Sequence, residues 1–139
     1  MDRKKTTSNK LSVVQYINSL PSAQKIKDGH TSLDLLKKIT NLKPRLWSPT
    51  LIGFGRYQYE YESGHKGNAP LIAFSPQKTR QVFYVINNSK IQKKLLSKLG
   101  KYKTGKVCLY INKLADIDLD ILEQILVEAW KARDENNAC

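Results

Sequence analysis

The apolar residues of this chain change their spacing between the first third of the sequence and the middle. In residues 12–20 and 22–40 they recur every three to four positions, which is the spacing of one helical face. In residues 57–62 tyrosines alternate with polar and charged side chains, which is the period of a half-buried strand. A switch of this kind within 139 residues limits the chain to folds that combine helices with a sheet.

Similar patterns continue to the end of the sequence. The further elements expected are strands at 71–75, 80–87 and 106–111 and helices at 87–99 and 115–130. Ser89 or Asn88 is the expected N-cap of the first of these helices, and Asp118 that of the second. Pro44 and Pro49 place their segment in a loop or at a sheet edge. We predict an α+β fold, with a mainly antiparallel sheet of about four to five strands and helices packed on one face.

The two ends differ in composition from the rest of the chain. Residues 1–10 are expected to form a disordered basic tail, residues 11–131 a single compact domain, and residues 132–139 a flexible tail. The stretch after the N-terminus lacks the apolar region of a secretory signal, and no segment has the roughly 20 apolar residues of a membrane span. The two cysteines, Cys108 and Cys139, give no disulfide framework. We expect a cytoplasmic protein that does not associate with a membrane.

Residues 99–111, LGKYKTGKVCLYI, carry the spacing of a phosphate-binding P-loop at Gly100, Gly105 and Lys106. A P-loop follows a strand and opens a helix, whose N-terminus then binds the phosphates. Here a predicted helix precedes Gly100 and a predicted strand follows, and Val107 occupies the position of the magnesium-binding Ser or Thr. We therefore expect a helix end and a lysine-bearing turn, not a site of nucleotide hydrolysis.

The positive charge of +12 is concentrated in the middle of the chain. Residues 63–115 hold eleven Lys and Arg residues and no Asp or Glu. Such a block attracts anions over about 8–10 Å at physiological salt. The candidate anion-binding residues are Lys78, Arg80, Lys101, Lys103 and Lys106. The expected partner is a small anionic ligand or an acidic protein; non-specific binding of nucleic acid through the basic block is an alternative.

Aromatic residues of the predicted sheet are the second part of this candidate site. They are expected to wall a shallow pocket and comprise Trp47, Phe54, Tyr57, Tyr59, Tyr84 and Tyr110. Ser75 and the Ser63-Gly64-His65 turn show no recognisable arrangement of nucleophile, base and orienting group, and His30 and His65 form no metal-ligand motif. We therefore expect a small binding domain that is not an enzyme and carries no cofactor.

Four blocks of the sequence, in order, resemble the bacterial YdhG-like domain family, whose function is unknown. The blocks are WSPTLIGFGRYQYEYESG (47–64), FSPQK (74–78), LGKYKTGKVCLYI (99–111) and LADIDLDIL (114–122). The resemblance covers about residues 12–128 and implies a compact α+β domain. The chain departs from the usual family pattern at Gln77, where an arginine is common, and at Val107, where a serine is common.

Some members of that family are described as frataxin-like intracellular iron chaperones, which gives an alternative function and makes iron the alternative cofactor. Weakly held iron needs clustered carboxylates, and the segment that offers them contains Asp116, Asp118 and Asp120. Acidic residues at this position are also what the N-terminus of the following helix favours. We expect capping of the helix to be the main role of these aspartates.

Overall fold

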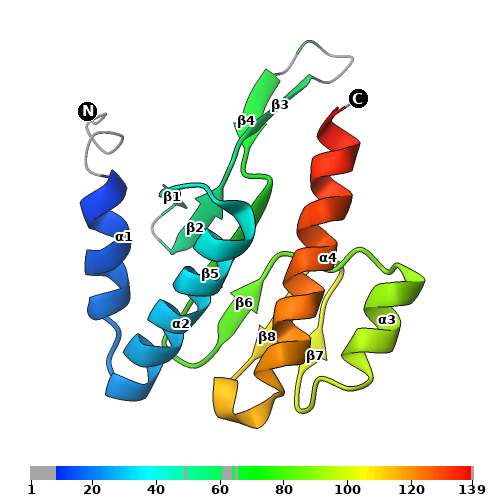
Figure 1. The fold of residues 1–139 in the computed structure, drawn as a ribbon. Helices are drawn as coiled ribbons and strands as arrows, with labels where there is room; N and C mark the ends of the chain where they lie inside the picture. Colours follow the sequence, from blue (N-terminus) through cyan, green and yellow to red (C-terminus); the bar gives the residue numbers. More distant parts are fainter. Residues whose placement is uncertain (1–8, 49, 61–63, 65, 139) are drawn as a thin grey trace.

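The computed structural model combines four helices with an antiparallel sheet, and the helices lie against one face of it (Figure 1). It describes residues 9–48, 50–60, 64 and 66–138, with side chains except at 9–12, 57–60, 66–68 and 133–138. The helices are α1 (Asn9–Asn18), α2 (Ala23–Thr40), α3 (Lys90–Leu96) and α4 (Leu119–Ala138), with a short 3-10 helix at Leu114–Asp116.

The main sheet has six strands in the order β1-β2-β5-β6-β8-β7, and every neighbouring pair is antiparallel. The strands are β1 (Pro44–Ser48), β2 (Leu51–Phe54), β5 (Ile72–Pro76), β6 (Gln81–Phe83), β7 (Lys103–Thr104) and β8 (Leu109–Ile111). Pro44 is the first residue of an edge strand, a position that tolerates a residue without an amide hydrogen.

A two-stranded arm extends from the main sheet between β2 and β5 (Figure 1). It consists of β3 (Tyr57–Glu60) and β4 (Lys66–Ala69), which pair only with each other. The chain turns into this arm at Gly55, whose φ of 73° favours glycine. The arm separates the tyrosines of β3 from the main sheet.

One face of the main sheet is buried beneath the helices. Alternate residues along the strands supply Ile52, Phe54, Ile72, Phe74, Phe83, Leu109 and Ile111 to this face, and all are almost completely inaccessible. The rings of Phe74 and Phe83 stack with their centroids 5.8 Å apart. The helices contribute Ile17, Leu36, Leu122, Ile125 and Leu126 to the same core. Burial of each large apolar side chain stabilises the fold by about 1.5–3 kcal/mol.

The first turns of α2 are tied to two loops at one end of the sheet. Lys25 Nζ donates hydrogen bonds to the carbonyl oxygens of Thr79, at 3.1 Å, and of Asn112. The buried Asp28 carboxylate accepts a hydrogen bond from the Leu114 amide at 3.1 Å. Because buried charged groups are costly without such partners, these contacts fix the loops relative to α2. They hold the turn after β5 beside the end of β8.

The start of α3 is organised by the buried side chain of Gln92. Its amide donates to the Val85 carbonyl at 2.7 Å and accepts from the Asn87 and Asn88 amides at 2.8 and 3.3 Å. Ser89 Oγ accepts from the Gln92 amide and caps the helix, as predicted. The connection from β6 into α3 is therefore fixed by one side chain.

Gly100 joins α3 to the lysine-bearing turn. Its φ is 120°, and a Cβ atom there would lie 2.7 Å from the Asp116 carbonyl oxygen. On either side, the Lys101 amide donates to that oxygen at 3.2 Å, and the Asp118 amide donates to the Leu99 carbonyl at 2.8 Å. The close contact between the two backbones thus requires glycine.

The predicted α+β class is confirmed, as are the antiparallel sheet and the placement of helices on one face. The sheet has six strands and not four to five, because the proline-containing segment around β1 forms an edge hairpin with β2. The helix expected from Ser12 begins at Asn9, and the helix expected at 22–40 is α2, capped by Ser22. At the other end α4 continues to Ala138, so no helix boundary falls at residue 132.

The P-loop-like segment contains a helix end and a lysine-bearing turn, as predicted, but the strand after it starts later. Residues 103–104 form β7, which pairs with β8, and the Gly105 amide donates to the Cys108 carbonyl at 2.8 Å across the hairpin turn. β8 begins at Leu109, not at Lys106. A sequence dominated by lysines and glycines concealed this short hairpin.

Substitution of Gly100 by alanine is expected to lower the free energy of unfolding by about 1–3 kcal/mol, because the φ angle is strained for any other residue. Urea denaturation measures the change. Lys98→Ala, at an exposed position of the same turn, should change the free energy by less than about 0.5 kcal/mol. Equal effects of the two substitutions would contradict the described contact between Gly100 and Asp116.

Candidate anion-binding site

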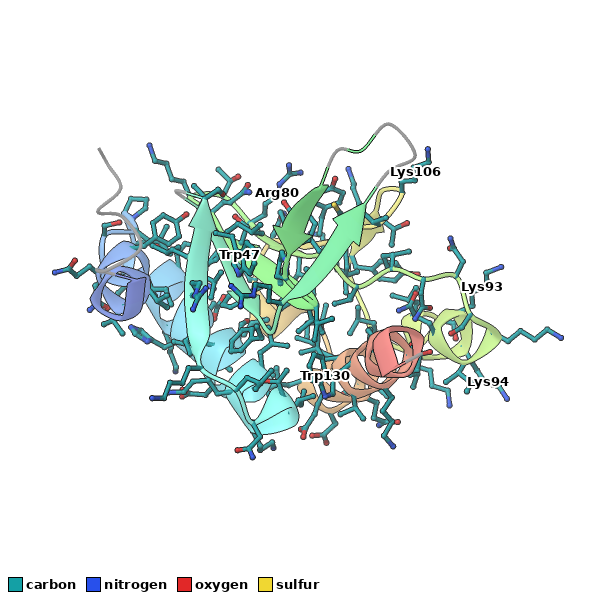
Figure 2. The ribbon with its side chains drawn as sticks, turned by 90° about the horizontal axis from the view of Figure 1, so that it is seen from above. Trp47, Arg80, Lys93, Lys94, Lys106 and Trp130 are labelled. Atoms are coloured by element: carbon teal, nitrogen blue, oxygen red, sulfur yellow. The ribbon has the colours of Figure 1, made fainter. Side chains whose placement is uncertain are left out.

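The residues that alternate with the buried row point to the opposite face of the main sheet. Gly53 of β2 and Tyr110 of β8 belong to this second row. Figure 2 shows Trp47 and Arg80 on this side of the sheet and Trp130 of α4 on the other. Among the described residues, no helix lies on this side, which we call the helix-free face. Arg80 on this face is exposed, and Trp47 and Tyr110 are half-buried, whereas the outward residues of β5 and β6 are buried.

A pocket of about 190 Å³ lies on the helix-free face at β8 and β7. Its lining residues are Arg80, Lys101, Tyr102, Lys103, Tyr110 and Asn112. Strand pairing explains why residues distant in sequence meet here: Tyr110 lies opposite Lys103 on one side and Val82, two residues after Arg80, on the other. We call this site the Arg80 pocket.

Arg80 and Tyr110 form the centre of the Arg80 pocket. The Arg80 guanidinium carbon lies 4.3 Å from the centroid of the Tyr110 ring, a cation–π contact that orients the planar guanidinium. Arg80, Lys101 and Lys103 are exposed, and none of them forms an ion pair with a described carboxylate. The pocket therefore presents three positive charges to solvent.

The phenols next to Arg80 are held in their neutral form. The pKa of Tyr110 is raised, chiefly by a side-chain hydrogen bond with Cys108. The pKa of Tyr84 is raised mainly by burial and further by the nearby Cys108 and Tyr110. The positive charge of Arg80 lowers both values but does not reverse either shift. Both phenols are protonated at neutral pH and can donate hydrogen bonds.

The hydrogen bonds of Lys25 position the two sides of the Arg80 pocket. Thr79, whose carbonyl accepts one of them, directly precedes Arg80, and Asn112, whose carbonyl accepts the other, lines the pocket. Lys25 thus connects α2, which lies on the helix-covered face of the sheet, with the backbone segments at Thr79 and Asn112. Its ammonium group is used in these contacts and is not part of the lining.

The structure brings together three of the five predicted cationic residues. Arg80, Lys101 and Lys103 line the same pocket, whereas Lys78 and Lys106 are exposed in the turns that precede β6 and β8 and do not line it. Both turns lie beyond the strand ends, so their side chains extend into solvent. The basic block therefore supplies the cationic lining of this pocket, but only some of its members reach it.

The six predicted aromatic residues do not form one pocket. Phe54 is fully buried against the helices, because it belongs to the inward row of β2, and its assignment to the pocket is wrong. Tyr84 and Tyr110 lie close together on the helix-free face, and Trp47 lies on the same face but at a second pocket. The backbones of Tyr57 and Tyr59 are in the β3–β4 arm, and their side chains lie outside the described residues.

Two aspartates of the alternative metal site make structural contacts, Asp118 through its side chain and Asp116 through its backbone. Asp118 Oδ1 accepts hydrogen bonds from the amides of Asp120 and Ile121, at 3.0 and 3.3 Å, and so caps α4 as predicted. The Asp116 carbonyl oxygen accepts the Lys101 amide. No group of three or more His, Cys, Asp or Glu side chains suited to a metal ion occurs in the described part of the chain.

Sequence reasoning missed two residues of the Arg80 pocket and a whole second pocket. Tyr102 lies between two predicted lysines, and Asn112 directly follows a predicted strand, so inclusion of the neighbours of the candidate residues would have found them. The second pocket is lined by Lys43, Arg45, Trp47 and Arg56, which precede the acid-free block. They lie outside residues 63–115, to which the prediction of a basic block was confined, although residues 35–59 contain no Asp or Glu either.

The chain was compared with family models, curated proteins and solved structures, and none of them matches it. None of the described helices combines the length and the apolar character that a membrane crossing requires.

Removal of the Asp118 side chain tests its role as a cap. Asp118→Ala should lower the free energy of unfolding by about 1 kcal/mol, because two helix amides lose their acceptor. Asp120→Ala, at an exposed position of the same turn, should cost less, about 0.3–1 kcal/mol through the helix dipole alone. Thermal denaturation with and without ferrous iron, in anaerobic buffer, measures both effects. Stabilisation by iron that either substitution abolishes would contradict a purely structural role.

Proposed function

We propose that the protein is a non-catalytic binding domain for a small ligand that carries a phosphate or similar anionic group, and that the ligand binds in the Arg80 pocket. The proposal rests on one observation: Arg80, Lys101 and Lys103 come from two separate segments and line the same pocket. None of the three forms an ion pair with a carboxylate of the described residues.

The geometry of the pocket suits an oxyanion. A guanidinium presents paired donors that match two oxygens of a phosphate or carboxylate, and stacking on Tyr110 reduces the freedom that Arg80 would lose on binding. Lys101 and Lys103 add point charges at the rim. The amide of Asn112 and the phenols supply neutral hydrogen bonds. A volume of about 190 Å³ suits phosphate with a small organic substituent.

The proposal of binding without catalysis is supported by the chemistry of the lining. Its guanidinium, ammonium and phenol groups are hydrogen-bond donors, which suit an anion. The raised pKa of Tyr110 strengthens this assignment, since that phenol remains a donor under ordinary conditions. We also propose, from its four sequence blocks, that the chain is a YdhG-like domain.

The binding of inorganic phosphate tests the proposal. Thermal denaturation of the protein in a phosphate titration at constant ionic strength should show a rise in Tm, and at ten times Kd the gain is about 1.4 kcal/mol. The double substitution Lys101→Ala/Lys103→Ala should abolish most of the rise, and Arg80→Ala should reduce it, because each removes charge from the pocket.

The matched control is Lys93→Ala/Lys94→Ala, which removes the same charge from α3. Both lysines are exposed and lie away from the Arg80 pocket (Figure 2). This variant should retain the full stabilisation by phosphate. If both double variants lose it equally, or if chloride at matched ionic strength stabilises the protein as well as phosphate, general charge screening explains the effect and the proposed site is wrong.

A further inference from the structure

A second basic pocket lies on the helix-free face, near the opposite edge of the main sheet. It has a volume of about 260 Å³ and is lined by Leu42, Lys43, Arg45, Trp47, Gly53, Gly55 and Arg56. Arg45 pairs with Gly53 across β1 and β2 and shares its outward orientation. We call this site the Trp47 pocket; it combines three cationic side chains with one large aromatic ring.

The indole of Trp47 packs directly against the backbone of Gly53, where a side chain would leave no room for it. A Cβ atom on Gly53 would lie 2.5 Å from Cδ1 and 2.6 Å from Nε1 of the indole, and 2.6 Å from Pro70 Cβ. Only glycine allows this close approach. The indole Nε1 is also buried, and no described residue accepts a hydrogen bond from it, which costs about 1–3 kcal/mol. Packing against the backbone of β2 fixes the ring, and its place in the wall of a basic pocket puts it beside the cationic side chains.

We propose that the helix-free face binds single-stranded nucleic acid, with backbone phosphates in the Arg80 and Trp47 pockets and a base stacked at Trp47. The part of this inference that concerns the Arg80 pocket rests on the function proposed above; the Trp47 pocket is an independent observation. Cationic side chains beside accessible aromatic rings are a general way to bind single strands, because every base has a flat aromatic surface.

The spacing of the two pockets suits an extended chain. Trp47 and Arg45 belong to β1, and Tyr110 belongs to β8, four strand spacings away in the sheet. At about 4.8 Å per spacing the two sites are about 19 Å apart. One small ligand in a 190 Å³ pocket does not span this distance, whereas several consecutive nucleotides do. Tyr84, half-buried between the two sites, adds an aromatic group along the way.

The aromatic residues favour nucleic acid over an acidic protein as the partner. Carboxylates on a protein surface need only the positive charges, whereas Trp47 and the Arg80–Tyr110 pair provide flat surfaces next to those charges. Stacking of a base on an aromatic side chain contributes about 1–3 kcal/mol, and arginine adds cation–π contacts. The arrangement therefore matches a ligand that alternates phosphates with planar rings.

Fluorescence anisotropy with labelled oligothymidylates of 4, 8 and 12 nucleotides tests this inference on the full chain. The 12-nucleotide ligand should bind more tightly than the 4-nucleotide ligand. The longer chain can place phosphates in both pockets in many registers, whereas the shorter chain must be almost fully extended between them. Binding of the 12-mer should weaken at least tenfold in each of two double variants, Lys43→Ala/Arg45→Ala and Lys101→Ala/Lys103→Ala. It should weaken less than twofold in the control Lys93→Ala/Lys94→Ala.

The salt dependence of binding gives a second test of the same variants. Each pocket variant should reduce the magnitude of the slope of log affinity against log salt by about 1.4, since two phosphate contacts are lost.

Tryptophan fluorescence reports on stacking directly. The chain has two tryptophans, so Trp130→Phe leaves Trp47 as the single reporter. Oligothymidylate should quench this emission, and inorganic phosphate should not. In the same background Trp47→Phe should keep the fold, verified by circular dichroism, and bind the 12-mer more weakly than the parent because a smaller ring stacks less well.

Three results would overturn the inference, and they are distinguishable from failure of the proposed function. Stabilisation by phosphate that depends on Lys101 and Lys103, with no binding of oligothymidylate, would leave the Arg80 pocket as a small-ligand site. Equal loss of 12-mer affinity in all three double variants would mean unspecific attraction by net charge. Polyglutamate that binds as tightly as the 12-mer would identify an acidic protein as the partner.

Discussion

The packing of apolar side chains against one face of an antiparallel sheet determines both the fold and the position of the candidate sites. Because successive residues of a strand point to opposite faces, burial of Ile52 and Phe54 under the helices directs Gly53 outward, and burial of Leu109 and Ile111 directs Tyr110 outward. Trp47, Arg80 and Tyr110 thus lie on the face that no described helix covers.

Hydrogen bonds at the ends of elements then set the finer geometry of the Arg80 pocket. Lys25 holds the backbones next to Arg80 and at Asn112, and Gly100 allows the lysine-bearing turn to approach the segment before α4. The candidate site is consequently built on strands and their fixed connections, and the contact with Tyr110 orients Arg80. Preorganisation of this kind reduces the entropy that binding costs.

Much of the fold followed from apolar periodicity, which identified the two long helices and the strand at Ile72–Pro76. Short elements did not, because β7 has two residues and β2 has four, and neither is long enough to show a period. Local charge led to Arg80, Lys101 and Lys103, but strand pairing decides which neighbours join them. Phe54 was misassigned for the same reason, since its aromatic character does not reveal which face of β2 it occupies.

We propose that ligands bind to the helix-free face. Backbone amide chemical shifts of ¹⁵N-labelled protein, recorded in a titration with unlabelled 12-nucleotide oligothymidylate, test this most directly. Perturbations are expected at Arg45, Trp47, Arg80 and residues 101–112, with little change along α3 and the solvent side of α4. Perturbations centred on α3 and α4, with the residues of the two pockets unaffected, would contradict it.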